Sequence, residues 1–286
     1  MENLILASEQ TIHANLYFGT LMVAMLLELL IPLRAGGFPL RSRWIGNFLL
    51  TVVNLAIDRL VMPIAGLALA FLALERGWGL FNAIEVPLLV NIVVTILVMD
   101  LVNYTQHRLL HGVPWLWRVH KVHHSDPDVD ITTTIRFHPL ESVFSTAVNF
   151  IPVIVFGFAP VAYFIYAMLL VILGFISHSN FRIPGRLEQV AGLLFVTPYL
   201  HRIHHSSHQP ATDSNFGSAF SFWDRMLGTF TPSRAMDQQT MELGLSEYRD
   251  KKYLQVHWLL AMPFIKDPAS ASAPQPLAGD SRRATL

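Results

Sequence analysis

No cysteine occurs among the 286 residues of this sequence. Its absence excludes disulfides, thiolate-bound zinc, iron–sulfur clusters and cysteine nucleophiles. Any metal that the chain binds must therefore be held by histidine, carboxylate or amide side chains.

Charged residues are also scarce, at 14% of the chain against about 25% in an ordinary soluble domain. The mean hydropathy is +0.43, which is high for a protein in water. The formal net charge is zero, so nothing in the composition indicates a nucleic-acid partner. Scarce charge and high hydropathy together predict an integral membrane protein.

Several hydrophobic segments are long enough to cross a bilayer, which takes roughly 20 helical residues. They are Leu16–Leu33, Trp44–Leu74, Val86–Val102, Leu140–Phe158 and Val161–Ser177. The second segment contains Asp58, Arg59 and Pro63, and the sequence leaves open whether it is one broken helix or a hairpin. We expect an all-α integral membrane protein with four to five transmembrane helices.

Lysine and arginine lie mostly outside these segments, in three groups. They occupy residues 34–43, residues 108–136 and the chain from residue 182 onward, and only Arg59 and Arg76 lie elsewhere. The positive-inside rule places all three groups in the cytoplasm. We therefore expect a cytosolic helical cap formed by residues 107–136 and 181–265.

The domain organisation follows from the same pass along the chain. Residues 1–266 show no repeat and no internal linker, so we expect them to form a single membrane-embedded domain. Residues 267–286 are rich in alanine, serine and proline and lack periodicity, which predicts a disordered tail without an assigned function.

Histidine is the residue type whose placement stands out, because eleven of the thirteen lie between His107 and His208. Eight of them form one pair spaced i, i+4 and two triplets spaced i, i+3, i+4, and residues at these spacings share a helix face. The pair and the triplets are His107 and His111, then His120, His123 and His124, then His201, His204 and His205. Thr197-Pro198 and Pro114 are typical starts for the helices that would carry the triplets.

One such triplet would also suit a solvated, weakly basic helix face, but the repetition favours metal binding. Eight imidazoles exceed what one ion can use, so the pattern predicts two metal ions at the membrane edge. Imidazole suits iron, zinc, copper and nickel, and the spacing does not choose among them.

Five further histidines lie outside the pair and the triplets. His178 ends the last hydrophobic segment and is expected as a ninth ligand, although a helix-terminal histidine paired with the helix dipole is the alternative. His138 could be a tenth ligand, a hydrogen-bond partner of a ligand or an interfacial residue. His208 is expected beside the ligands rather than among them, and His13 and His257 are expected at the surface.

Polar side chains near the clusters could orient the ligands, because a ligating imidazole usually donates its second N–H to a carboxylate or a carbonyl. Asp100 lies on nearly the same helical face as His107 and is costly inside a membrane without a role. Asn180 is a further candidate for a ligand or for an orienting group. Five more carboxylates lie nearby: Asp126, Asp128, Glu141, Asp213 and Asp224. We interpret Asp126 and Asp128, on either side of a proline, as loop-forming residues.

The three histidine motifs HRLLH, HKVHH and HRIHH, in this order between hydrophobic segments, resemble the histidine boxes of the fatty acid hydroxylase/sterol desaturase superfamily. The resemblance extends over about residues 100–230. It is supported by the stretches Phe137–Glu141, His178–Asn180, Thr197-Pro198, Asn215–Gly217 and Trp223–Arg225.

The resemblance implies an O2-dependent di-iron oxidoreductase that acts on an unactivated C–H bond of a lipid, with hydroxylation favoured over desaturation. It implies two iron ions held by the eight paired and triplet histidines together with His178. No stretch of this sequence is left for a fused cytochrome, so we expect an external ferredoxin or cytochrome, linked to NAD(P)H, to supply electrons. The expected partners are this electron carrier, the lipid substrate and the bilayer.

A lipid that reaches such a site needs an apolar path between helices. Large side chains of the last two segments could line one, or they could simply pack in the helix bundle. They are Phe156, Tyr163, Phe164, Tyr166 and Met168.

Two rival functions use the same histidines, namely a polytopic membrane transporter and a zinc-binding protein. A transporter would need ionisable residues deep within several spans, whereas these histidines lie at segment ends. The zinc protease motif HExxH is absent, because Arg108 follows His107.

Overall fold

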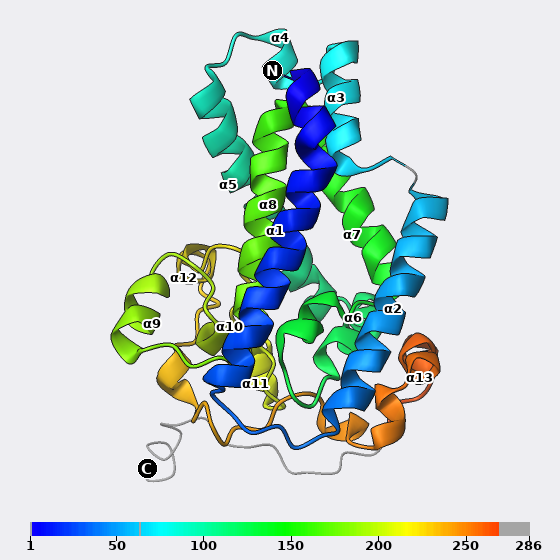
Figure 1. Ribbon diagram of the computed structural model, residues 1–286, viewed down its shortest axis with the longest axis vertical. Coiled ribbons are helices and arrows are strands. Elements are labelled where there is room, and N and C mark those ends of the chain that lie inside the picture. The colour runs from blue at the N-terminus through cyan, green and yellow to red at the C-terminus, as the bar shows by residue number, and fades with distance from the viewer. Residues whose placement is uncertain (1, 63, 269–286) are drawn as a thin grey trace.

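The structure is a computed structural model that describes residues 2–62 and 64–268 (Figure 1). In this part of the chain helices dominate, and the extended segments form only three isolated bridges, so the expected all-α fold is confirmed. The α-helices are α1 (Glu2–Leu30), α2 (Leu40–Val61), α3 (Gly66–Arg76), α4 (Leu80–Ala83), α5 (Leu88–Gly112), α6 (Pro114–His124), α7 (Pro139–Pro152), α8 (Pro160–His178), α9 (Gly185–Ala191), α10 (Pro198–His204), α11 (Gln209–Thr212), α12 (Phe222–Met226) and α13 (Val256–Ala261). Shorter turns are η1 (Ile131–Ile135), the π-helical η2 (Val153–Gly157), η3 (Ser233–Ala235), η4 (Ser246–Tyr248), η5 (Lys251–Leu254) and η6 (Met262–Phe264).

Among the described residues, five helical segments are long and apolar enough to cross a membrane, in agreement with the expected number. They are Thr11–Leu30, Leu40–Ala83, Leu88–Gly112, Pro139–Gly157 and Pro160–His178. The chain is therefore a multi-pass membrane protein. In the second segment, α3 continues in the direction of α2, so this segment is a broken helix and not a hairpin (Figure 1).

A turn at Ala159-Pro160 joins the segment Pro139–Gly157 to α8. The π-helical turn η2 ends α7, and Pro160 occupies the first turn of α8, where its missing N–H costs nothing. Gly157 in this turn has a φ of 63° and lies against Gly79, where an added Cβ would come within 2.2 Å of the Gly157 nitrogen. The two glycines let the backbones touch at the end of the bundle far from the histidines.

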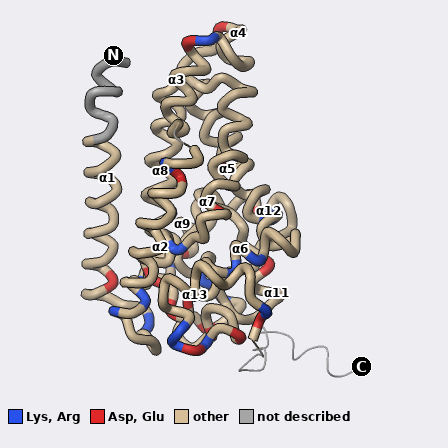
Figure 2. Tube along the Cα trace, turned by 90° about the vertical axis from the view of Figure 1, so that its right-hand side faces the viewer, with Lys and Arg blue, Asp and Glu red and all other residues tan. Residues whose placement is uncertain are grey.

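The other helices, α6 and α9 to α13, gather at one end of the long helices and form a cap (Figure 1). Charged residues are concentrated there too, while the long helices are almost free of them up to the tip near α4 (Figure 2). The helix starts agree with the prediction. Pro114 lies in the first turn of α6, and the Thr197 hydroxyl caps α10 by accepting from the Leu200 N–H at 3.3 Å.

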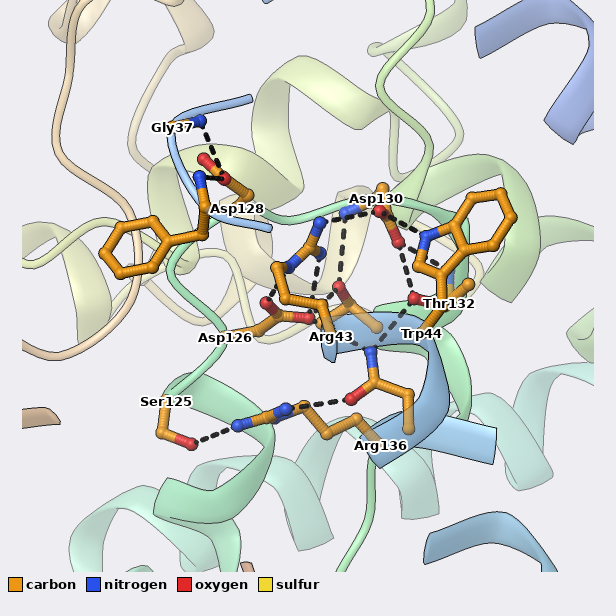
Figure 3. A network of polar contacts seen from close by, with 12 residues as sticks. Gly37, Arg43, Trp44, Ser125, Asp126, Asp128, Asp130, Thr132 and Arg136 are labelled. Carbon is orange, nitrogen blue, oxygen red and sulfur yellow. Dashed lines mark hydrogen bonds and ion pairs between the residues drawn. The ribbon is translucent and has the colours of Figure 1, made fainter. Parts of the chain in front are cut away.

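A buried ionic network joins α2 to the segment after α6 (Figure 3). The Arg43 guanidinium donates to Asp126 at 2.7 Å and to Asp130 at 2.8 Å. On the next turn of α2, Asn47 donates to Thr132 at 2.9 Å and accepts from Arg136 at 2.8 Å. The nearby arginines hold the pKa of Asp126 at about 2, so this carboxylate stays ionised inside the protein.

This network corrects the interpretation of two acidic residues. Asp126 and Asp128 lie in a loop, as expected, but both also make contacts across the fold. Asp126 is fully buried in the pair with Arg43. Asp128 accepts from the backbone N–H groups of Gly37 and Phe38 at 2.8 Å and 2.7 Å, and so links the α1–α2 connection to the cap.

The division of the chain into residues 1–266 and a tail stays a prediction, because residues 269–286 of that tail lie outside the described residues. Asp267, the first residue of the expected tail, forms an ion pair with Lys121 and accepts from the Tyr248 hydroxyl at 2.6 Å. At least this residue is therefore joined to the cap.

Candidate metal centre

The nine histidines expected as ligands come together in two groups, each with its ring nitrogens within 4.8 Å of one another. Group one contains His107, His111, His120, His124 and His204. Group two contains His123, His178, His201 and His205. His178 lies in group two with members of both triplets, where a ninth ligand would have to lie.

Each histidine triplet contributes to both groups, an arrangement that the spacing did not predict. In α6, His120 and His124 join group one, while His123 joins group two. In α10, the roles are reversed, because His201 and His205 join group two and His204 joins group one. Residues four apart on a helix differ by only about 40° in direction, so each i, i+4 pair serves one group. The two short helices thus hold the groups side by side.

The Nε2 atoms point at one another in both groups. In group one, the His107 Nε2 lies 3.0 Å from that of His204 and 3.1 Å from that of His120. In group two, the His178 Nε2 lies 2.9 Å from that of His201 and 3.2 Å from that of His123. Such convergence of buried imidazole nitrogens requires either shared protons or a cation between them.

The hydrogen bonds of the opposite ring nitrogens favour a cation. The Nδ1 atoms of His107 and His204 each lie 2.8 Å from a backbone carbonyl oxygen, of Phe216 and Ser214, and that of His120 lies 2.7 Å from the Glu141 carboxylate. These oxygens only accept, so each neutral ring carries its proton on Nδ1 and directs the Nε2 lone pair into the group. Three lone pairs then meet without a proton between them, which fits a bound metal ion.

Protonation of the rings does not relieve the repulsion between these nitrogen lone pairs. Burial, reinforced by the neighbouring imidazoles, holds the pKa of His123, His124, His201, His204 and His205 well below the ordinary value. Neutral imidazole is the form that binds a metal. The donor set of nine nitrogens therefore suits a pair of borderline metals such as iron or zinc.

Further groups orient the remaining rings. The Nδ1 atoms of His111 and His178 lie 3.2 Å from Asp213 and 2.9 Å from the Gly174 carbonyl oxygen. Four other Nδ1 atoms are buried and lack a hydrogen-bond partner among the described residues, namely those of His123, His124, His201 and His205. The protein thus fixes the ring tautomer at five of the nine positions.

The structure assigns other places to the less certain candidates. His138 caps α7, where its Nδ1 accepts from the Leu140 N–H at 3.2 Å, and it belongs to neither group. His208 precedes α11 and is likewise outside both groups. Asn180 donates to the Arg34 carbonyl at 3.0 Å. His13 and His257 are exposed, as expected.

Asp100 contacts none of the nine histidines and acts on a loop instead. It accepts from the backbone N–H groups of Ala219 and Phe220 at 2.9 Å and 3.2 Å. Asp224 accepts from Phe216 and Gly217 at 2.8 Å and 2.9 Å. Asp100 and Asp224 thus hold the loop of residues 214–220 in place. The backbone carbonyl groups of this loop orient the His107 and His204 rings.

The side chains considered for a lipid path are mostly accounted for by packing. Tyr166 belongs to a core cluster with Leu69 and Met99, and Phe156 and Tyr163 pack against that cluster. Met168 is buried as well.

Sequence reasoning missed the part played by α2. Its buried or partly buried polar residues form a stripe at helical spacing that contacts residues 126–142. The stripe consists of Arg43, Asn47, Thr51, Asn54 and Asp58. A recurrence every three or four residues within an apolar segment was the signal that could have revealed it.

Residues 92–229 match the fatty acid hydroxylase family, and this range contains all nine histidines. Over this range the chain is similar to that family, and the relatives it matches are members of the fatty acid hydroxylase/sterol desaturase superfamily. We therefore interpret the two histidine groups by comparison with members of this superfamily.

Individual relatives are lipid-modifying enzymes by name. The chain is 32% identical to the ornithine lipid hydroxylase OlsE of Rhizobium tropici over 63% of its own length and 52% of the relative. It is 28% identical to the alkylglycerol monooxygenase of Xenopus tropicalis over 77% of its length and 47% of the relative. It is 29% identical to the cholesterol 25-hydroxylase of Mus musculus, over 50% and 48%. The chain thus spans about half the length of these relatives. No solved structure matches it.

Proposed function

We propose that this protein is an O2-dependent membrane oxidoreductase that hydroxylates an unactivated C–H bond of a lipid at a di-iron centre. The observation that carries the proposal is the pair of histidine groups, with five and four converging ring nitrogens, at the end of the membrane helices. The nine grouped histidines would hold the two irons. A bound iron pair activates O2, and the protein's own part is to position the groups around it.

The residues of this chain have definite tasks in such a reaction. Glu141, Asp213 and three backbone carbonyl groups fix the direction of five imidazoles before a metal arrives. Most of the histidines are buried, which excludes bulk water from the centre and limits side reactions.

We further propose an apolar cavity beside α6 as the approach of the lipid. A cavity of about 550 Å³ lies between α6, the start of α7 and η6, and its walls include Trp115, Val119 and Leu140. Val119 and Leu140 directly precede His120 and Glu141, which form the buried pair in group one. None of the nine histidines lines this cavity, so we propose it only as a place where an acyl chain could enter between α6 and α7.

Hydroxylation is favoured over desaturation because the relatives named above are hydroxylases and monooxygenases. Their printed substrates differ from one another, so the proposal extends to a membrane lipid and not to one named lipid. Insertion of one oxygen atom consumes O2, two electrons and two protons and releases water. We propose that an external ferredoxin or cytochrome, reduced by NAD(P)H, supplies the electrons.

We also propose that the cap faces the cytoplasm. The basic residues are concentrated at the cap end of the molecule (Figure 2), and such an excess is typical of the cytoplasmic side.

The test compares lipids of cells that express the wild type, His204→Ala or His257→Ala, grown under ¹⁸O2. His204 belongs to group one, and the exposed His257 is a matched control outside both groups. Wild type and His257→Ala are expected to produce a lipid heavier by one ¹⁸O atom, and His204→Ala is expected to produce none. Purified wild type is expected to carry two irons per chain.

Other results of this experiment would favour desaturation, zinc binding or transport over hydroxylation. A product lighter by two hydrogens would replace hydroxylation by desaturation. Two tightly bound zinc ions with an unchanged lipid profile would favour the zinc-binding alternative. Metal that exchanges readily and crosses vesicles with the protein would favour a transporter. Protein with two irons that leaves every lipid unaltered under O2 and a reductant would contradict the oxygenase role.

A further inference from the structure

A patch of exposed apolar side chains lies outside the membrane-spanning segments, on α9, the turn after it and α12. Val190 and Met226 are 67% and 69% exposed, although both are large and apolar. The remaining members are Leu187, Leu193, Leu194 and Leu227, each at least 45% exposed. We call these six residues the ledge patch. Large exposed apolar side chains gathered on neighbouring segments are typical of an interaction site.

The ledge patch belongs to one firmly joined unit. Arg225 of α12 donates to the Gly192 carbonyl at 2.8 Å, and the Ser221 hydroxyl donates to the same carbonyl at 2.8 Å. The Ser221 N–H donates to the Leu194 carbonyl at 2.9 Å. Phe195 and Phe220 stack with their ring centroids 5.7 Å apart. These contacts connect the two halves of the patch.

The position of this unit along α5 indicates what covers it. Asp100 in the membrane segment of α5 accepts from Ala219, Phe220 and the Trp223 indole, so α12 lies beside that level of the helix. Twelve residues separate Asp100 from the end of α5 at Gly112, which is about 18 Å along the axis. Figure 1 shows α9 and α12 to the side of α8 and α5, above the lower edge of the cap. The unit thus reaches back toward the bilayer alongside a helix that crosses it.

We propose that the ledge patch lies in the interfacial layer of the bilayer, with lipid as its partner. Apolar side chains enter the headgroup and acyl boundary when a short amphipathic element runs along a membrane surface. The exposed Arg182 and Arg186 at the start of this unit suit lipid headgroups. The unit contacts α5 at the level of Asp100, inside the membrane-crossing segment Leu88–Gly112, which favours lipid over a soluble partner or a second copy.

The same unit is connected to a metal-ligand helix. Glu188 is the buried residue of α9, and it accepts from the Thr197 hydroxyl at 2.6 Å. Thr197 caps α10, which carries His201 and His204. The ledge patch is thus joined through Glu188 and Thr197 to the helix that carries His201 and His204.

The absence of cysteine allows a direct test. Single-cysteine variants Val190→Cys and Met226→Cys carry a nitroxide label in the full protein, reconstituted in lipid nanodiscs. Accessibility is measured with O2, which concentrates in lipid, and with a water-soluble nickel chelate. Leu89→Cys, on the exposed side of α5, is the lipid control, and Gln239→Cys, on an exposed cap turn, is the water control.

Labels at residues 190 and 226 are expected to match residue 89, with an O2-to-nickel accessibility ratio several-fold above that of residue 239. A ratio equal to that of residue 239 overturns the proposal. Protection from both reagents with dipolar broadening between labels overturns it in favour of a second copy. The measurement needs neither iron nor turnover, so its result is independent of the proposed enzymatic function.

Discussion

Glu141 and His120 form a buried pair whose oxygen and nitrogen are 2.7 Å apart, at the boundary between the cap and α7. Loss of such an orienting partner weakens metal binding by about 10–100-fold. Glu141→Ala is therefore expected to lower the metal affinity by this factor, and Glu141→Gln by less, because the amide oxygen still accepts from Nδ1. Chelator competition measures the affinity.

Glu85→Gln is the control for this prediction, because Glu85 is exposed and lies in the connection before α5. It is expected to leave the affinity unchanged. Equal affinities for wild type and Glu141→Ala would show that the pair does not orient the ligand.

Arg43 is a second residue with a definable energetic role, because it neutralises Asp126 and Asp130 inside the protein. Removal of one partner from a buried ion pair costs about 3–5 kcal/mol. Arg43→Met is expected to lower the free energy of unfolding by this amount, as measured by denaturant titration in micelles. Arg41→Met, two residues away on the exposed side of α2, is expected to change it little. Similar losses for both variants would contradict a specific role of the network.

At the scale of elements, α2 approaches the C-terminal part of the cap unusually closely. A Cβ at Gly46 would lie 2.0 Å from the Leu254 carbonyl oxygen, whereas a Cβ at Gly19 in α1 would meet nothing within 4 Å. Overpacking of this kind costs about 1–3 kcal/mol, while alanine is otherwise better than glycine in a helix. Gly46→Ala is expected to lower the thermal midpoint and Gly19→Ala to leave it unchanged or raise it. An unchanged thermal midpoint for Gly46→Ala would mean that α2 and η5 can move apart without a loss of stability.

For the short helices α6 and α10, the sequence predicts the helix starts and the shared histidine faces but not the grouping of the histidines. The helix starts at Pro114 and Thr197 and the shared face of each histidine triplet follow from local rules of capping and periodicity. The division of each triplet between two groups does not, because it depends on how α6 and α10 face each other across the cap. No local pattern encodes that crossing.

At the scale of the whole molecule, the charge distribution makes a prediction about topology. Single cysteines at Gln239, between η3 and η4, and at Glu85, between α4 and α5, are expected to react with an impermeant thiol reagent from opposite sides of the membrane. Gln239→Cys is expected to be protected in intact cells and labelled after lysis, and Glu85→Cys is expected to show the reverse accessibility. Labelling of Gln239→Cys in intact cells would place the cap outside the cytoplasm.

Metal removal is expected to affect the whole cap, because the histidines come from α5, α6, α8 and α10 and from the residue after α10. A ligand that binds only the folded state at 1,000 times its dissociation constant stabilises it by about 4 kcal/mol. Chelation is therefore expected to lower the thermal midpoint of wild type, and to lower that of His204→Ala by less, because this variant keeps the four histidines of group two. An identical midpoint with and without metal would argue against a metal that bridges these elements.

Composition and helical spacing predict the membrane character, the helical segments and eight of the nine grouped histidines, because each is a local property of the chain. The division of the histidines between the two groups, and the contact of Asp100 with a loop instead of a ligand, depend on the packing of distant segments. The same packing pairs Asp126 with Arg43 across 83 residues. The reason is physical: periodicity specifies which side of a helix a residue occupies, but the partner on that side is set by packing between distant segments.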